Sequence, residues 1–141
     1  MASALTNHQV RLAARPEGLA TRDNWQFTEE PVGDSVEGGV VVRTILLSLD
    51  PAMRGWMNDS KSYIAPVGVG DVMRAVGIGR VHASRTDAYP VGAYVTGGLG
   101  VQEYARFDPA GAKKAGLAKI DPRLAPLPKW LNALGMPGMT A

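Results

Sequence analysis

The chain has 141 residues, one domain's worth, and its 45% hydrophobic and 20% charged residues are typical of a soluble globular protein. Its formal charge is only +2 and its basic residues are dispersed, which argues against a nucleic-acid-binding surface. It contains no cysteine, which excludes disulfides and thiolate zinc sites, and its two histidines lack carboxylates at metal-ligand spacing, so no metal site is expected. No segment is typical of a signal peptide or a membrane span, and we expect a cytoplasmic protein.

The first two predicted elements are strands near the N-terminus. Apolar and polar residues alternate around Val10 and Leu12, which are expected inward, with the polar residues between them outward. A weaker alternation follows, in which Trp25 and Phe27 are expected to point inward. These two segments predict antiparallel pairing.

The next element organises the chain. Residues 40–49 are apolar on both faces, which predicts a central strand buried on two sides. The strand leads into residues 48–59, where the backbone breaks at Asp50-Pro51 and the following side chains are polar, cationic and aromatic. Rigid scaffolds present functional groups in this way, on a loop at the end of a buried element.

Further short strands are expected after this loop. Gly77 and Gly79 interrupt one of them, which indicates a bulge or a tight barrel corner. The pair Lys113-Lys114 is interpreted as a solvated turn. About seven brief strands, separated by turns rich in glycine and proline and without a sustained helix, predict a mainly β fold, a partly open β-barrel with short helices.

The pattern changes near the C-terminus. Between residues 126 and 135 the large apolar residues recur every three or four positions, which predicts an amphipathic helix that stops at 135–138. Thr140 resembles the first residue of a new element, and we expect a second domain to follow.

The glycine-rich segments do not form a dinucleotide fingerprint. Segments 68–70, 77–79 and 97–100 lack the third glycine of Gly-X-Gly-X-X-Gly or lead into strands, whereas the fingerprint requires a helix after the glycines. We interpret all three as structural turns.

Four residues of the central stretch and its sequel have alternative roles. Asp50 is favoured as a turn residue that caps local amides over a general base. Arg54 either holds an anion or carbonyl oxygen through its fork of donors, or pairs with Asp50 or Asp59. Tyr63 either hydrogen-bonds a substrate oxygen that becomes negative in the transition state or is simply packed. Trp56 is expected to pack.

Several separated motifs together resemble a known family. They are residues 44–55 (TILLSLDPAMRG), 58–63 (NDSKSY), 102–104 (QEY) and 134–141 (LGMPGMTA). They look like the N-terminal half of the zinc-independent medium-chain dehydrogenase/reductase family of NADPH-dependent double-bond reductases, which includes leukotriene/prostaglandin and curcumin reductases. The similarity extends from about Asn7 to the end of the chain.

The resemblance implies a GroES-like β-barrel in residues 1–141, followed by a Rossmann domain that is not in this sequence. It implies NADPH and an α,β-unsaturated ketone or aldehyde in a cleft between the two domains, with no zinc. Hydride then goes to the β-carbon while the carbonyl develops enolate character.

The resemblance also assigns site residues. It implies Tyr63 as the catalytic residue, Met53 and Arg54 at the substrate, and Pro51 at the cofactor. It likewise places two residues of the C-terminal segment, Met136 and Thr140, at the nicotinamide end of the cofactor.

Two positions depart from the family's pattern. Ala52 stands where the family usually has a tyrosine, and Val101 stands where a tryptophan is frequent. Both changes imply a wider or redirected pocket and leave more of the oxyanion role to Tyr63.

The sequence therefore predicts one domain of an NADPH-dependent enone reductase that acts on a small molecule. We expect this domain to be inactive in isolation, and the full-length enzyme is a possible homodimer. The alternative is a stand-alone β-barrel that works by association and exposes an apolar patch.

Overall fold

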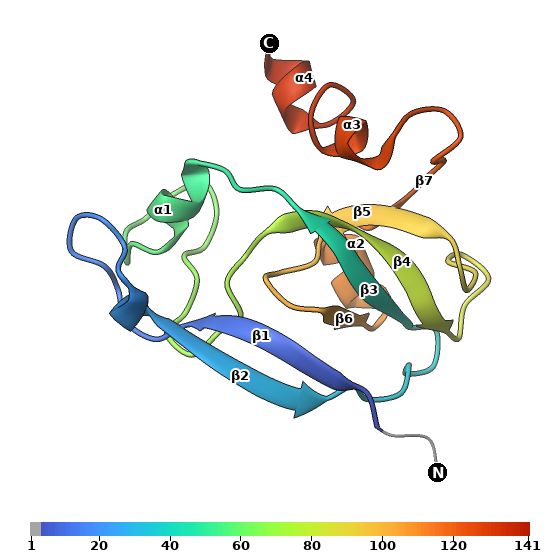
Figure 1. Cartoon of the computed structure of the whole chain (residues 1–141), viewed down its shortest axis with the longest axis horizontal. Coiled ribbons are helices and arrows are strands. Elements are labelled where there is room, and N and C mark those ends of the chain that lie inside the picture. The colour runs from blue at the N-terminus through green and yellow to red at the C-terminus, as the bar shows by residue number, and fades with distance from the viewer. Residues whose placement is uncertain (1–3) are drawn as a thin grey trace.

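The chain folds into two antiparallel sheets flanked by short helices in a computed structural model that describes residues 4–141 (Figure 1). The strands are β1 (Thr6–Leu12), β2 (Trp25–Pro31), β3 (Val40–Leu47), β4 (Val76–Ser84), β5 (Tyr94–Gly98), β6 (Tyr104–Phe107) and β7 (Ala118–Ile120). The helices are α1 (Ala52–Trp56), α2 (Pro109–Lys114), α3 (Leu127–Leu131) and α4 (Met136–Thr140), and a 3-10 turn, η1, spans Arg22–Asn24. The prediction of a mainly β fold built from short strands is confirmed.

The larger sheet carries the main core. Its strand order is β6-β3-β4-β5-β7, and β1 pairs with β2 in a separate hairpin. One face of the five-stranded sheet packs Val42, Val81, Val95 and Leu99 against α2, which lies behind the sheet in Figure 1. As expected, β3 is internal, because β4 and β6 pair with its two edges.

The prediction that β3 is buried on both sides is only half correct. Val40, Val41 and Val42 are buried, but Ile45 is 45% exposed and Leu49, beyond the strand, is 85% exposed. The pairing with β6 ends at Arg43, so the second half of β3 runs past the core and its apolar side chains reach the surface. That half borders both grooves described below.

The glycines of β4 accompany an irregular pairing, as predicted. The register of β3 against β4 shifts between Val41 and Val42 and again between Thr44 and Leu46. A Cβ atom at Gly77 would lie 2.6 Å from the Leu46 carbonyl oxygen, so only glycine fits this close approach without a shift.

The hairpin β1–β2 departs from the predicted alternation. Gln9, expected outward, is only 7% exposed and donates from Nε2 to the Oε1 atom of Gln102 at 3.1 Å. Phe27, expected inward, is 62% exposed. Isolated bridges join β1 to Gln102 and Val72 on the edge that β2 leaves free, so contacts from distant segments decide which side chains are covered.

Helix α2 was not predicted, and Lys113-Lys114 lies in its last turn rather than in a simple turn. The sequence signal is Asp108-Pro109. Asp108 caps the helix by accepting a hydrogen bond from the Gly111 N–H at 2.6 Å, and proline suits the first helical position.

The predicted C-terminal helix is shorter than expected, and a second helix lies where the stop was predicted. Helix α3 ends at Leu131, and α4 begins at Met136 with Pro137 in its first turn, where a missing N–H costs nothing. The Thr140 hydroxyl donates to the Met136 carbonyl oxygen at 2.6 Å, so Thr140 lies within α4 instead of at the start of a new element.

Candidate functional site

The stretch after β3 turns sharply into a helix that the sequence did not predict. The Oδ1 atom of Asp50 accepts a hydrogen bond from the Ala52 N–H at 2.8 Å, which confirms the turn role of this aspartate. Helix α1 follows at once, over Ala52–Trp56. The side chains of this stretch are therefore held on a short helix instead of a loop.

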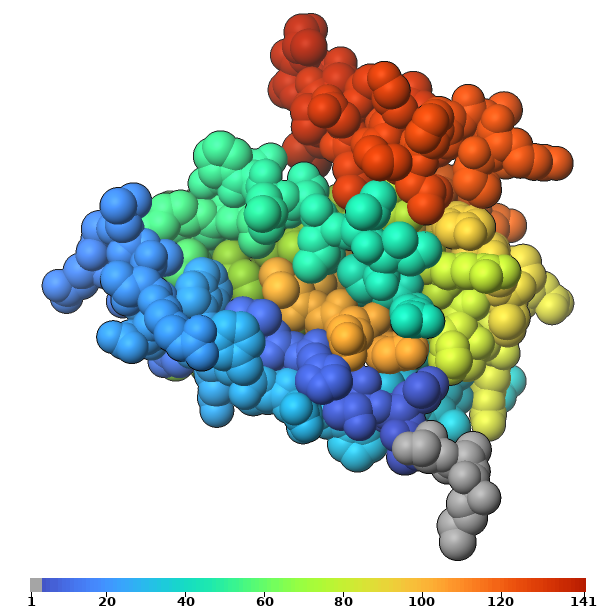
Figure 2. Space-filling view, in the orientation of Figure 1, coloured from blue at the N-terminus to red at the C-terminus, as the bar shows by residue number. Residues whose placement is uncertain are grey.

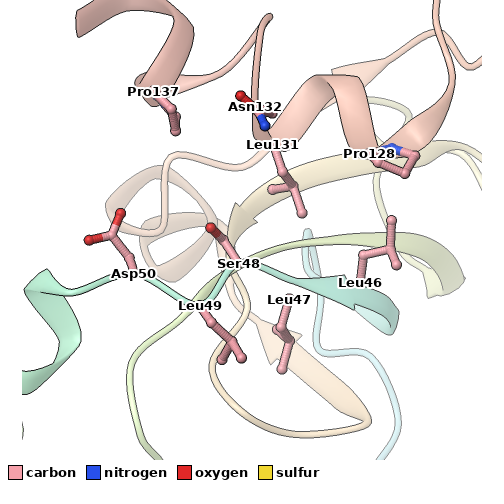
Figure 3. A pocket seen from close by; sticks show the side chains of 9 residues that line it. All are labelled: Leu46, Leu47, Ser48, Leu49, Asp50, Pro128, Leu131, Asn132 and Pro137. Carbon is pink, nitrogen blue, oxygen red and sulfur yellow. The ribbon is translucent and has the colours of Figure 1, made fainter. Parts of the chain in front are cut away.

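A groove separates this stretch from the C-terminal helices. Its volume is about 350 Å³, and we call it the reaction groove. It is lined on one side by Leu46, Leu47, Ser48, Leu49 and Asp50, and on the other by Pro128, Leu131, Asn132 and Pro137 (Figure 3). The fold thus brings together two segments that are far apart in the sequence.

The residues predicted to hold the cofactor lie beside this groove. Pro51 follows the lining residue Asp50, and Met136, which is 76% exposed, precedes the lining residue Pro137. Thr140 is exposed at the end of α4. Within residues 4–141, no hydrogen bond joins these three residues across the groove, and their cofactor role stays a prediction.

Met53 and Arg54 face other parts of the chain. Met53 is half-buried against a small core formed by Leu12, Met57 and other apolar residues. Arg54 donates to the carbonyl oxygens of Gly18 at 2.8 Å and Pro16 at 3.1 Å, and to Oδ1 of Asn58 at 2.6 Å.

Those bonds restrict what Arg54 can do. Within residues 4–141, Arg54 forms no ion pair with Asp50 or Asp59, so the structural pair considered from the sequence is wrong. The guanidinium instead ties α1 to the turn after β1 and leaves only its remaining N–H groups for a ligand.

Tyr63 lies on the segment after α1 and is 87% exposed. A packing role does not fit a side chain so open to solvent. The segment is anchored near its end, where the Val67 N–H donates to the Trp56 carbonyl oxygen at 2.8 Å. Tyr63 is therefore free to meet a ligand or another protein surface.

Arg74 supplies a second anchor for the segment that carries Tyr63. Its Nη2 atom donates to the Ala65 carbonyl oxygen at 2.8 Å, and its guanidinium lies 5.3 Å from the ring centre of Trp56. Trp56 packs in the same small core as Met53, which confirms its packing role. No sequence pattern indicates this role of Arg74, because the fold sets its partners.

A second groove lies between the hairpin and the exposed half of β3, and we call it the inter-sheet groove. Its volume is about 490 Å³. Apolar side chains line much of it, with polar and acidic ones beside them: Val10, Phe27, Ile45, Leu47 and Val101, with His8, Glu29 and Glu103. In Figure 2 the hairpin in blue, the orange segment before β6 and β3 in teal meet on this face.

An exposed ion pair marks the polar part of the inter-sheet groove. The Nδ1 atom of His8 lies 2.6 Å from Oε2 of Glu103, and its Nε2 atom lies 3.4 Å from Oε1 of Glu29. The hydrogen bond with Glu103 raises the pKa of His8, and the same bond lowers the pKa of Glu103.

The described residues contain neither a metal-binding cluster nor a membrane-spanning helix. In residues 4–141, no three histidine, cysteine or acidic side chains are grouped so that they could hold a metal ion. None of the helices in this part of the chain has the length and apolar character needed to cross a membrane.

Known proteins decide the family. The model of a family described as the N-terminal domain of oxidoreductase matches residues 8–115. The NADPH-dependent curcumin reductase of Escherichia coli (strain K12) is 38% identical over 135 residues, which cover 96% of this chain and 38% of the relative.

The chain belongs to this family of oxidoreductase N-terminal domains. Another relative, the NADP(+)-dependent 2-alkenal reductase of Nicotiana tabacum, is 31% identical over 145 residues, which cover 100% of this chain and 41% of the relative. The chain spans about two fifths of the length of these relatives.

Solved structures match this oxidoreductase N-terminal domain closely. Crystal structures of CurA from Vibrio vulnificus, one of them in complex with NADPH, both give a TM-score of 0.83, with sequence identities of 35% and 34%. The matches cover 95% and 94% of this chain and 38% of each CurA chain. The resemblance to double-bond reductases and the fold that it implies are confirmed.

Proposed function

We propose that the protein containing this chain uses NADPH to reduce the C=C bond of α,β-unsaturated ketones or aldehydes, and that residues 1–141 form the substrate-side domain. The observation that carries the proposal is the reaction groove, where the segment after β3 faces α3 and Pro137 of α4. The names of the NADPH-dependent curcumin reductase and the 2-alkenal reductase support the choice of substrate class.

The residues beside the reaction groove fit the nicotinamide end of NADPH. Leu131 and Pro137 offer an apolar wall for a flat ring, and Asn132 adds an amide that can bond a carboxamide (Figure 3). The Thr140 hydroxyl uses its proton on the Met136 carbonyl oxygen, so its own oxygen is available to accept from an amide N–H.

The phosphates of NADPH do not fit this chain. None of the segments 68–70, 77–79 and 97–100 leads into a helix, and each of the described helices has five or six residues. A glycine loop before a longer helix is the usual pyrophosphate site. We therefore assign the phosphates to a nucleotide-binding domain outside residues 1–141.

The chain's own residues bind and polarise the substrate in this proposal. Bound NADPH supplies a hydride to the β-carbon. The Tyr63 hydroxyl donates a hydrogen bond to the carbonyl oxygen, which becomes negative as the electrons of the C=C bond move toward it. Protonation of the α-carbon from water then completes the saturated ketone.

The remaining assigned residues set the position of the substrate. Met53 supplies apolar contact from α1, and Arg54 holds α1 against residues 16–18 while its remaining N–H groups are available to the substrate. Pro51 fixes the backbone next to the cofactor edge of the groove. A cytoplasmic location and a homodimer of the full-length protein belong to the same proposal.

The test is the loss of NADPH absorbance with purified full-length protein and but-3-en-2-one as substrate. The matched control is the allylic alcohol but-3-en-2-ol, which has the C=C bond but cannot form an enolate. We expect saturable turnover of the enone and none of the alcohol. No turnover of any short enone, or equal turnover of both compounds, contradicts the proposal.

A second candidate function is a non-catalytic association module. It is favoured by the exposed apolar side chains Leu49, Met136 and Met139, which are 85%, 76% and 86% exposed. Light scattering on the full-length protein distinguishes the two functions through the molar mass. An association module should form larger assemblies as the concentration rises, whereas an enzyme covers these side chains with its own second domain.

A further inference from the structure

Four side chains from neighbouring strands form a row across the face of the larger sheet that is opposite α2. The strands β6, β3, β4 and β5 supply, in that order, Tyr104, Arg43, Arg80 and Tyr94, and we call this set the arginine row. Each of the four is adjacent in sequence to a residue of the main core, and side chains alternate between the two faces of a strand. All four therefore point away from the core, and the fold gathers arginines that are dispersed in the sequence.

The two arginines of the row are like charges that lie directly opposite each other on β3 and β4. Such a cross-strand pair is destabilising by itself. Both side chains are exposed, and within residues 4–141 neither forms an ion pair with a carboxylate. Hydrogen bonds with His8 and, to a smaller extent, the charge of Arg43 lower the pKa of Glu103, but Oε2 of Glu103 is already bonded to His8. An anion between the two guanidinium groups removes the repulsion between them.

The guanidinium of Arg80 is held in place without any ligand. Its Nε atom donates to the Gly92 carbonyl oxygen at 3.1 Å, and its central carbon lies 5.7 Å from the ring centre of Tyr94. In the part of the chain that the structure describes, its two terminal nitrogens form no hydrogen bond. Two free terminal nitrogens offer the fork of N–H groups that fits two oxygens of a phosphate.

Aromatic side chains lie at both ends of the arginine row. Tyr94 is half-buried beside Arg80. Tyr104 is also half-buried and packs edge to face with the exposed His82, with 5.5 Å between the ring centres. The two tyrosines give the row apolar borders next to its charged centre, so a ligand that joins a phosphate to a carbon skeleton finds contacts for both parts.

We propose that the arginine row is a binding site for a phosphate monoester, a small molecule that carries a terminal phosphate group. The phosphate lies between Arg43 and Arg80 and accepts hydrogen bonds from both guanidinium groups, and the rest of the molecule lies against one of the tyrosines. A terminal phosphate carries nearly two negative charges at pH 7, which match the two positive charges of the row. No residue of the row lines the reaction groove, and the proposal does not depend on the reaction.

NMR titration of the full-length protein with phenyl phosphate tests the site at constant ionic strength. The amide signals of the four row positions are followed, because they report on this face of the sheet and not on a nucleotide site elsewhere. We expect saturable shifts with a dissociation constant of about 1–10 mM, since the contacts are few and exposed. Arg43→Gln and Arg80→Gln should each weaken binding at least about fivefold, because each removes charged hydrogen bonds.

The matched control is Arg22→Gln, which makes the same change of charge away from the row. Arg22 is also exposed and also lies over an aromatic ring, that of Phe27 at 5.3 Å. This variant should keep the dissociation constant within about twofold of the original. Both row substitutions remove a repelling charge from an exposed side chain, so these variants should remain folded.

Two further ligands identify the source of the phosphate. Inorganic phosphate should bind the row more weakly than phenyl phosphate, because it lacks the carbon skeleton. Dimethyl phosphate, a diester like those of nucleic acids and phospholipids, should bind at least about fivefold more weakly, because it carries one negative charge. Equal affinity for the diester overturns the assignment to a monoester. Shifts that do not saturate, or an affinity that neither row substitution changes, overturn the site itself.

Discussion

Tyr63 is the residue on which the proposed chemistry depends. Its side chain is 87% exposed, whereas the hydroxyl of Tyr89 donates to the Leu117 carbonyl oxygen at 2.9 Å and so has a structural partner. A phenol that is so exposed and has no packing role is available to a substrate oxygen. Arg54, by contrast, spends its donors on backbone carbonyls and acts mainly by holding α1.

We predict that Tyr63→Phe lowers kcat on the order of 10²-fold in the full-length protein and changes KM by less than about twofold. The hydroxyl is needed most when the carbonyl oxygen becomes an enolate oxygen, so its loss affects the transition state more than binding. Steady-state kinetics measure this. Tyr89→Phe is the control and should lower stability without this fall in kcat; unchanged turnover in Tyr63→Phe would remove the catalytic assignment.

The pair His8–Glu103 predicts a pH dependence of stability. The pKa of His8 is raised above its ordinary 6.5, so its contribution is present below pH 6.5 and is lost as the pH rises through the folded value. The pKa of Glu103 is lowered from 4.5, so its contribution is present above pH 4.5 and is lost as the pH falls through the folded value. The pair therefore stabilises the fold most between these two values.

Chemical denaturation of the original protein and of His8→Asn checks this at pH 5.5 and pH 8.5. The difference in unfolding free energy between the two proteins should be larger at pH 5.5, and high salt should reduce it because both side chains are exposed. His82→Asn is the control, since His82 has no ion pair within residues 4–141. A difference in unfolding free energy that is larger at pH 8.5 than at pH 5.5 would contradict the predicted direction of the pH dependence.

At the scale of elements, α1 and the segment after it form one unit that contacts from Arg74 and Val67 hold in place. Arg74 lies over the ring of Trp56 and bonds the Ala65 carbonyl oxygen, and the Val67 N–H bonds the Trp56 carbonyl oxygen. The clamp fixes the two ends of the segment that carries Tyr63. Arg74 is therefore a positioning residue in the proposed reaction.

We predict that Arg74→Met lowers the unfolding free energy by about 1–2 kcal/mol and loosens the segment after α1, because it removes a charged hydrogen bond and a stacking contact. Trypsin cleavage after the exposed Lys61 measures the loosening and should become faster. Arg80→Met is a matched control: Arg80 also lies over a ring, that of Tyr94 at 5.7 Å, and bonds a carbonyl oxygen, that of Gly92. Equal cleavage rates in both variants would show that Arg74 does not clamp the segment.

For the molecule as a whole, the proposed function gives residues 1–141 one wall of a nucleotide site and leaves the phosphates to another domain. The lining of the reaction groove combines apolar side chains with Ser48, Asp50 and Asn132. In this proposal, the other domain covers the exposed apolar side chains on α4 and after β3.

We predict that a polypeptide of residues 1–141 binds NADPH with a dissociation constant weaker than about 1 mM, because the contacts of one nicotinamide face alone are few. Isothermal titration calorimetry measures the affinity, with the full-length protein as the control. A micromolar dissociation constant for residues 1–141 would mean that this chain holds the phosphates after all.

The sequence by itself determined the class of fold and the central stretch. Period-two alternation, the glycines of β4 and the Asp50-Pro51 turn are local signals, and each reports a conformation that neighbouring residues set. The family motifs likewise lie in continuous segments, so Tyr63, Met53 and the C-terminal residues could be named before their positions were known.

Only the tertiary structure decided which faces are covered and which residues meet. Gln9 is buried by Gln102, His8 meets Glu103, and Arg74 holds the segment of Tyr63, all through contacts between different segments of the folded chain. Short helices were expected, but the positions of α1, α2 and α4 were not predicted, because a helix of five or six residues is stabilised by its surroundings more than by its own sequence. The inter-sheet groove exists for the same physical reason, since it lies between two sheets whose packing no local pattern encodes.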